Sequence, residues 1–334
     1  MKNDINNKLI NRRRALGIIG VASIAGSIYS LKKYKEYIKE VKFEPLEWKG
    51  YALGAPARIV IHHPEKKEAE AALEKILSDI NYYENLFSLY LPYSEISRLN
   101  REGKIKNPSS EMVSILKKSA YFSNLTSGSF DITVQPLWNL YSQHFKNNTT
   151  NEGPSSKRIN SMLHLVDWQK IYIDDSLIQF ETKNMGITLN GIAQGWITDK
   201  VAKRLEDIGI NNVLVDLGET YGLGAHHSGR DWNIAVQGPY KTGKTVNLRN
   251  SAVATSGGYG TVFESSGKHH HIFNPKTGLS ANIRPAISVV AKNATTADAI
   301  ATAAICMQDD KIRDIASNLN LEVFSLNSNG VKIL

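Results

Sequence analysis

The order of strand and helix patterns along the chain constrains its fold more than any other feature. Residues 65–87 carry an apolar stripe at helical spacing, which includes Ala69, Ala72, Ile76 and Ile80. Short strand patterns then come in runs, with no regular alternation of strand and helix and no repeat. This order argues against a doubly wound parallel sheet. We expect an α+β fold in which helices pack on mixed sheets.

Periodicity and turn residues predict the individual elements. We expect helices at 65–87, 109–124, 191–209, 295–306 and 309–319. We expect strands at 57–62, 169–173, 177–181, 186–189, 212–217, 232–237, 252–255 and 286–291, with two more at the C-terminus. The polar stretch 147–156 is expected to be a surface loop. No break in composition divides residues 43–334, so we expect them to form one domain.

The first 42 residues differ from the rest of the chain in charge. They hold ten Lys or Arg and three acidic residues, which is +7 of the chain's net charge of +8. The nearly neutral remainder argues against a nucleic-acid partner. Arg12, Arg13 and Arg14 precede a largely apolar run at 15–31, a pattern typical of a twin-arginine-like export signal or of a short N-terminal membrane anchor. Either way we expect residues 43–334 to be exported, in the periplasm or anchored in the inner membrane facing it.

Several motifs resemble ligand-binding patterns, but the residues around them argue against ligand binding. Residues 238–245 fit a phosphate-binding loop, but β-branched residues follow where that loop needs a helix, which favours a hairpin turn. Residues 222–227 lack the third glycine of a dinucleotide motif. In a strand, at most His269 and His271 share a face, so one functional imidazole is favoured over a zinc site. Cys306 is the chain's one cysteine, which excludes an internal disulfide, and its helical context predicts a small buried side chain.

Three further segments carry polar groups suited to chemistry. Asp298 and Thr302 are spaced i, i+4, so on a helix they present two hard oxygens to one point, as Mg²⁺ requires. The alternative is an exposed Asp and a Thr bonded to its own helix. The turn at 190–195 opens a helix and favours an anion, unless it is a simple glycine turn. Residues 254–260 form a second Gly/Ser loop or a hairpin end. Tyr90 either stacks on a ring or packs in the core.

Taken in order, these segments resemble the FAD:protein FMN transferases of the ApbE family. The resemblance covers about residues 53–307, and the matching stretches are 94–100, 126–134 with 136–137, 189–199, 253–257 with Tyr259, 271–275 with 277–278, and 288–289 with Ala297, Asp298 and Thr302. It implies an ApbE-like single catalytic domain that uses FAD as substrate together with Mg²⁺. It further implies transfer of FMN to a Thr or Ser hydroxyl in a flavinylation-type motif of a target protein, with release of AMP.

The resemblance also implies roles for individual residues. By motif position, Asp298, Thr302 and the carbonyl oxygen of Gly191 would be metal ligands. His271 would be the base for the target hydroxyl, and Tyr90 would stack on the flavin. The other positions matched to the FAD site are Leu53, Ser129, Phe130, Asp131, Thr188, Gln194, Ser256, Gly257 and Phe273.

Some positions depart from the family pattern, and each departure removes or moves a charge near the expected pocket. They are Thr188, Asn190, Gln194, Glu219, Gly258 and Asn274. We therefore expect an altered metal affinity and turnover, and we hypothesise a specialised branch with one dedicated target. Two alternatives stay open on the same residues. One is an FAD pyrophosphatase, and the other is a non-enzymatic FAD-binding accessory of an exported redox complex.

Overall fold

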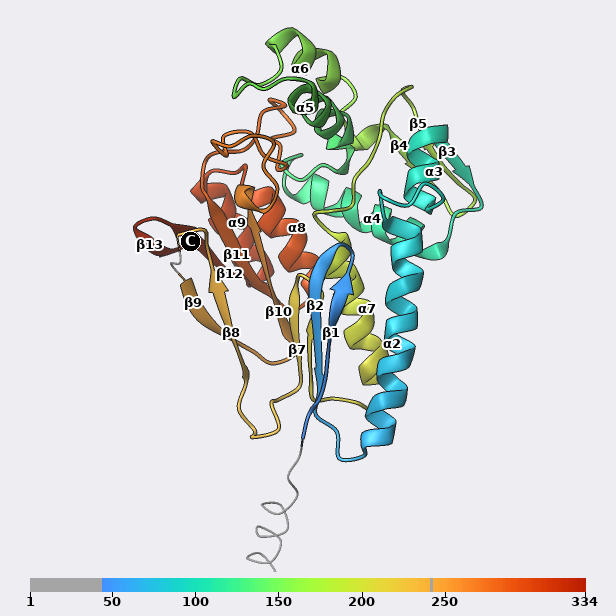
Figure 1. Cartoon of the computed structure of the whole chain (residues 1–334), viewed down its shortest axis with the longest axis vertical. Coiled ribbons are helices and arrows are strands. Elements are labelled where there is room, and N and C mark those ends of the chain that lie inside the picture. The colour runs from blue at the N-terminus through green and yellow to red at the C-terminus, as the bar shows by residue number, and fades with distance from the viewer. Residues whose placement is uncertain (1–43, 241–242) are drawn as a thin grey trace, which may run out of the picture. The chain divides into compact units, whose positions relative to one another are not determined.

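An eight-stranded sheet organises the unit formed by residues 45–334, with strand order β1-β2-β6-β7-β10-β11-β12-β13 (Figure 1). The structure is a computed structural model that describes residues 44–240 and 243–334. Every neighbouring pair in this sheet is antiparallel. The strands are β1 (Leu46–Ala52), β2 (Ala55–Ile61), β6 (Val213–Asp216), β7 (Thr220–Leu223), β10 (Ser251–Gly257), β11 (Ala286–Ala291), β12 (Glu322–Asn327) and β13 (Gly330–Ile333).

Two smaller sheets and the helices surround the large sheet. One small sheet has the order β3-β5-β4, from β3 (Lys104–Lys106), β5 (Leu177–Phe180) and β4 (Ile171–Ile173), and the other is the hairpin of β8 (Trp232–Gln237) and β9 (Gly243–Leu248). The helices are α2 (Lys66–Phe87), α3 (Glu95–Glu102), α4 (Ser110–Leu125), α5 (Gln135–Asn147), α6 (Ser156–Leu163), α7 (Ala193–Asp207), α8 (Ala294–Ala304) and α9 (Asp309–Leu319), with short 3₁₀ turns η1 (Ile132–Val134), η2 (Trp168–Lys170) and η3 (Gly258–Gly260). Among the described residues, none of the helices combines the length and apolar character needed to span a membrane.

The large sheet is covered on both faces, and β11 shows why. Its six residues, Ala-Ile-Ser-Val-Val-Ala, are all buried. Ile287, Val289 and Ala291 point to the core shared with the helices, whereas Ala286 and Val290 point to a second core under the β8–β9 hairpin. Alternate strand residues face opposite sides, so a strand covered on both faces is largely apolar, and the hydroxyl of its polar residue, Ser288, bonds to that of Thr255. On the helix side, α8 contacts β10 and β11, and α7 packs between α8 and α2.

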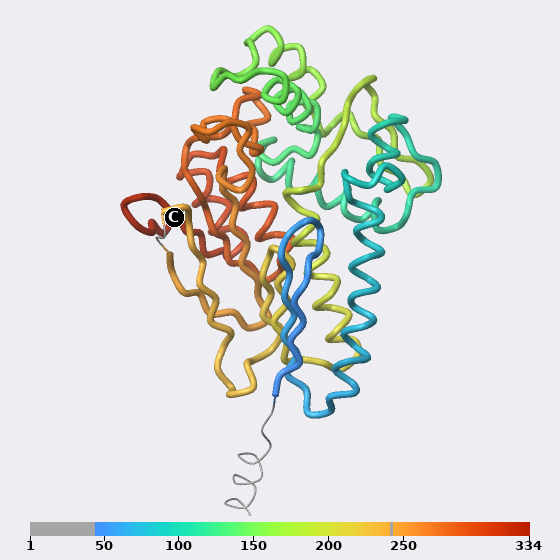
Figure 2. Tube along the Cα trace, viewed as in Figure 1, coloured from blue at the N-terminus to red at the C-terminus, as the bar shows by residue number. Residues whose placement is uncertain are grey.

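The long connection between β10 and β11 leaves the sheet and packs on the helices of the middle of the chain. Phe263 and Phe273 from this connection join Leu137, Tyr141 and Ile159 of α5 and α6 in a third apolar cluster. Figure 2 shows this connection, in orange, beside the green trace of α5 and α6. The cluster fixes the segment that carries His271.

The α+β prediction is confirmed, and most predicted elements are present with small shifts of their ends. The strand predicted at 186–189 is wrong. There the backbone N–H and C=O of Ile187 bond to the side chain of Asn100, and the N–H of Thr188 bonds to Ile132, so no neighbouring strand is paired. The sequence patterns missed β1, β3, β7, β9, α3, α5 and α6. The export-signal and anchor predictions concern residues 1–42, which lie outside the described residues.

Candidate functional site

The close approach of α7 and α8 is built by a glycine and an aspartate. A Cβ at Gly195 would lie 2.4 Å from the carbonyl oxygen of Ala294, so this contact requires glycine. One turn later, the carboxylate of Asp199 accepts the backbone N–H groups of Ala294 and Thr295 at 2.7 and 2.9 Å. These are unpaired donors of the first turn of α8, so Asp199 supports the start of this helix together with the N-cap Asn293, whose Oδ1 accepts the Thr296 N–H at 2.8 Å. Asp199 is a positioning residue that the sequence analysis did not single out.

This packing places Asp298 and Thr302 against the turn that opens α7. The Asp298 side chain is only 3% exposed, and its Oδ2 accepts the N–H of Gly195 at 3.0 Å. A Cβ at Gly191 would lie 2.8 Å from Thr302 Oγ1, and Ser256 Oγ at the end of β10 lies 3.3 Å from the same hydroxyl. The structure therefore brings together Gly191, Ser256, Asp298 and Thr302, and the alternative of an exposed Asp298 is wrong.

Two buried carboxyl groups dominate the electrostatics of this cluster. Burial raises the pKa of Asp298 to about 7 against the opposing hydrogen bond from Gly195, and repulsion from Asp199 adds to the rise. Glu219 is 7% exposed, and burial together with repulsion from Asp298 and Asp216 raises its pKa well above the ordinary range. Its Oε2 has no hydrogen-bond partner among the described residues. A cation bound nearby would relieve both groups, because an opposite charge favours the ionised carboxylate.

His271 has the tautomer that a general base needs. Its Nδ1 lies 3.0 Å from the carbonyl oxygen of Thr261, and its backbone N–H donates to the same oxygen at 3.1 Å. A carbonyl oxygen only accepts, so Nδ1 carries the proton and Nε2 keeps its lone pair. Burial lowers the pKa of His271, which keeps the ring neutral near pH 7. Thr261 directly follows η3 and the Gly/Ser loop at the end of β10.

A cavity of about 880 Å³ is lined mainly by α3, α5 and α6 and reaches the turn before α7 at Asn190, whereas Ser256, Asp298 and Thr302 are not among its lining residues. Tyr90 and Asn190 both line it, and Asn190 directly precedes Gly191. Tyr90 is 80% exposed, so core packing is wrong for this side chain and its ring remains available to stack. Arg101 and Arg158 also line the cavity. Cationic side chains in a concave site of this size suit an anionic ligand.

Comparison with known proteins shows the family to which the chain belongs. A sequence model of the ApbE family matches residues 53–325. The FAD:protein FMN transferase of Haemophilus influenzae is 29% identical over 267 residues, which cover 75% of this chain and 76% of that protein. The corresponding protein of Vibrio cholerae is 27% identical over 271 residues, covering 78% and 80%. The chain belongs to the ApbE family. It is therefore an enzyme of the transferase class, as its motifs predict.

Solved structures agree with the ApbE assignment. The ApbE protein of Thermotoga maritima superposes with a TM-score of 0.76 at 27% identity, covering 87% of this chain and 97% of that one. A mutant of the flavin transferase ApbE of Vibrio cholerae gives 0.74 at 25% identity, covering 87% and 97%. The α+β architecture described above is thus the ApbE fold.

Other residues matched to the FAD site lie in several environments. Phe130 and Phe273 are buried with their rings in the core. Asp131 accepts hydrogen bonds from the N–H and hydroxyl of Thr133 and from the N–H of Trp168, and burial raises its pKa to about 6. Asp131 therefore fixes the local backbone in this structure.

The remaining matched residues are half-buried and lie on loops or at the ends of helices and strands. Leu53 has a positive φ of 53° in the β1–β2 turn, and its N–H donates to Glu84. Thr188 Oγ1 accepts the N–H of Asn190, whereas Gln194 Nε2 donates to the carbonyl of Leu217. Ser129 and Gly257 are half-buried, and a Cβ at Gly257 would meet the ring of Tyr259.

The structure also shows the surroundings of the motifs for which ligand binding was not favoured. The residues after the 238–245 motif form β9, and Lys244 Nζ lies 4.3 Å above the ring of Phe324, so the hairpin interpretation is confirmed. His269, His270 and His271 do not form a metal-binding group among the described residues. Cys306 is half-buried at the end of α8, and burial raises the pKa of its thiol to about 12.

Proposed function

We propose that this chain is an Mg²⁺-dependent FAD:protein FMN transferase that acts on a Ser or Thr hydroxyl of an exported target protein and releases AMP. One observation carries the proposal. Buried Asp298 accepts the Gly195 N–H one helical turn before Thr302, whose hydroxyl lies against Gly191 and 3.3 Å from Ser256 Oγ, and the neighbouring Asn190 lines a cavity that also carries Arg101 and Arg158. The names of the relatives supply the substrate and the transferred group.

The donor set of this cluster fits Mg²⁺. Carboxylate, hydroxyl and carbonyl oxygens are the hard ligands that this ion takes, and it keeps coordination positions for phosphate and water. Asp298, Thr302 and the carbonyl of Gly191 would hold it, and the buried Oε2 of Glu219, which has no hydrogen-bond partner among the described residues, supports a cation nearby. When bound, the ion would neutralise charge that builds on the pyrophosphate during transfer.

The chain's own residues account for the remaining chemistry. His271 Nε2 accepts the proton of the target hydroxyl while its Nδ1–H stays bonded to Thr261. The hydroxyl oxygen forms a bond to the flavin-side phosphorus of FAD. The bond from that phosphorus to the bridging oxygen breaks, and AMP leaves with that oxygen. Tyr90 stacks on the isoalloxazine ring at the cavity wall, and Arg101 and Arg158 attract the anionic dinucleotide.

The test is the mass of an acceptor protein with a flavinylation-type Ser/Thr motif, incubated with the full chain, FAD and Mg²⁺. The proposal predicts a mass gain equal to an FMN phosphoester and one AMP released per acceptor. An acceptor with Ala at the target position should gain nothing and release no AMP. Release of FMN and AMP without any acceptor would instead identify an FAD pyrophosphatase. FAD bound and recovered intact would identify an accessory protein.

We also propose that residues 1–42 direct export of the protein, so that transfer occurs on the periplasmic side. The support is the arginine-led apolar run at 15–31. Replacing Arg12, Arg13 and Arg14 together with Lys keeps the charge and removes the paired arginines. Cell fractionation should then show the variant retained in the cytoplasm. Unchanged delivery to the periplasm or its membrane would contradict the twin-arginine route.

A further inference from the structure

Three histidines meet at the edge of the large sheet that lies away from the candidate active site. β2 and β7 both pair antiparallel with β6, so they run in the same direction. Glu219 precedes the start of β7, whereas His62 directly follows β2 and His226 and His227 follow β7. The histidines therefore lie at the opposite ends of these strands from the carboxylate cluster.

The backbone around these histidines is well fixed. The N–H of His62 donates to Asn212 at 2.8 Å, and the side chain of Asn212 donates to the carbonyl of Ala225 at 2.5 Å. The backbone of His226 forms two hydrogen bonds, from its N–H to Arg230 at 3.0 Å and to its carbonyl from Gly229 at 2.8 Å. Segments separated by 165 positions in the sequence are thus held together before any ligand binds.

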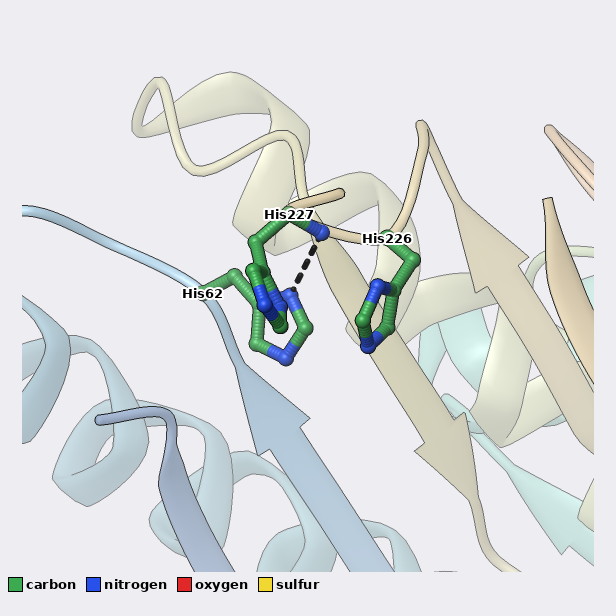
Figure 3. A group of neighbouring side chains, drawn as sticks. All are labelled: His62, His226 and His227. Carbon is green, nitrogen blue, oxygen red and sulfur yellow. Dashed lines mark hydrogen bonds between the residues drawn. The ribbon is translucent and has the colours of Figure 1, made fainter. Parts of the chain in front are cut away.

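The three rings converge. Ring centroids are 4.8 Å apart for His62 and His226, 4.6 Å for His62 and His227, and 4.1 Å for His226 and His227. One ring nitrogen from each lies within 4.8 Å of the other two (Figure 3). Nitrogens that share a tetrahedral zinc ion are about 3.4 Å apart, so the rings need to close by at most about 1.4 Å from the 4.8 Å limit. Trp232 packs against His62 at 4.9 Å and forms an apolar wall.

We propose that His62, His226 and His227 form a binding site for a divalent transition-metal ion that prefers imidazole, such as Zn²⁺. Nitrogen ligands select this class of ion, whereas Mg²⁺ and Ca²⁺ require oxygen. His62 is 6% exposed and anchors the site, and His227 lies at the surface, so an ion can enter from solvent with water as its fourth ligand. The ion would join the end of β2 to the β7–β8 connection.

The protonation state of the rings suits a metal. Burial, with repulsion from His226, His227 and Arg230, lowers the pKa of His62 to about 4. Burial, His227 and Arg230 also lower the pKa of His226. These rings are neutral at pH 7, which is the form that binds metals. Arg230 is the cation that opposes an incoming ion, although its guanidinium donates to the carbonyl of Asp231.

Hydrogen bonds of two rings bear on metal binding. Nδ1 of His226 accepts the N–H of Ser228 at 3.3 Å and lies 2.9 Å from its hydroxyl, so Nε2 of His226 is the nitrogen available to a metal once it loses its proton. The N–H of His227 donates to Nδ1 of His62 at 3.0 Å, drawn as the dashed line in Figure 3. Nδ1 is therefore an acceptor, and Nε2 carries the proton before metal arrives. Coordination through Nε2 moves that proton to Nδ1, and coordination through Nδ1 displaces the amide. Either way the backbone amide of His227 reports on the metal.

The test titrates Zn²⁺ into the chelator-stripped full chain in the presence of excess Mg²⁺. We expect one equivalent to bind, and His226→Ala and His227→Ala each to weaken binding at least about tenfold. His63→Ala is the matched control, because His63 neighbours His62 but lies outside the group. It should bind like the wild type, as should Asp298→Asn. Arg230→Gln should tighten binding about two- to fivefold, because it removes the opposing charge.

Two further readouts make the outcome decisive. Co²⁺ should give the visible absorption of a tetrahedral nitrogen site in the wild type and lose it in the His226→Ala/His227→Ala double variant. FMN transfer with Mg²⁺ should be the same in that variant and the wild type, so failure of the metal site and failure of the proposed function are distinguishable. Absence of stoichiometric Zn²⁺ binding, or equal binding by the double variant, overturns the proposal.

Discussion

The two edges of the large sheet bury ionisable groups of opposite kinds. At the candidate active site, Asp298 and Glu219 are carboxyls whose pKa values are raised by burial. At the far edge, His62 and His226 are imidazoles whose pKa values are lowered by burial. Desolvation disfavours the charged form in both places. Carboxyl oxygens are ligands that a hard cation takes, and a bound cation would favour their ionised form. Neutral imidazoles instead offer nitrogen lone pairs, so one sheet presents two different ligand environments.

Asp298→Asn is the substitution for which we expect the largest effect. The amide keeps an oxygen to accept the Gly195 N–H and has nearly the same volume, but the negative charge is gone. We expect the rate of FMN transfer to fall by about 10²–10³-fold or more, with weaker Mg²⁺ binding by calorimetry. Thr302→Val should also weaken binding, whereas Thr296→Val, on the same helix but outside the cluster, should not. Full activity in Asp298→Asn would contradict the assigned site.

The second prediction separates the base from the metal site. In His271→Asn the side-chain amide can still donate to the carbonyl of Thr261, but it offers no basic nitrogen. We expect kcat to fall by about 10²–10⁴-fold while Mg²⁺ affinity and the KM for FAD stay unchanged. Steady-state kinetics over pH should show that the acidic limb of the wild-type profile disappears. A matching loss of Mg²⁺ affinity would place His271 in the metal site instead.

The third prediction concerns how the stability of the metal-free protein depends on pH through Asp298 and Glu219. A pKa raised in the folded state means that the native protein binds more protons than the unfolded chain. The free energy of unfolding should therefore fall as pH rises from the ordinary value of 3.8 towards about 7 for Asp298. Glu219→Gln removes one buried acid, so its metal-free Tm at pH 7 should rise by about 2 °C or more. Calorimetry checks this, and a lower Tm would show that Glu219 stabilises the fold.

The fourth prediction is that the contribution of His62 to the free energy of unfolding changes with pH in the opposite direction. The pKa of His62 falls from 6.5 to about 4 in the folded state, so the unfolded chain binds more protons between these values. This contribution to stability is present above pH 6.5 and is lost as pH falls towards 4. His62→Asn does not titrate there and can still accept the His227 N–H. Its Tm should therefore decline less on acidification than that of the wild type, and an identical decline would contradict the assignment.

Sequence patterns predicted α2, α7, α8 and the i, i+4 pair of Asp298 and Thr302 because these depend on local periodicity. They could not predict that Asp298 is buried, since this depends on the close contact of Gly195 with α8 and on the cap supplied by Asp199. β7 was missed because it has four residues, including a glycine, and is stabilised by its neighbours β6 and β10. The histidine group was missed because its members come from segments far apart in the chain.

We propose above that the cluster at the start of α7 and on α8 holds the divalent ion of a flavin transferase. Crystals grown with FAD and Mn²⁺, an ion of similar ligand preference, would test it through the anomalous signal of the metal. The account predicts a peak about 2.1 Å from an Asp298 carboxylate oxygen and from Thr302 Oγ1, in contact with the FAD pyrophosphate. A peak elsewhere, with Asp298 free of metal while FAD is bound, would contradict it.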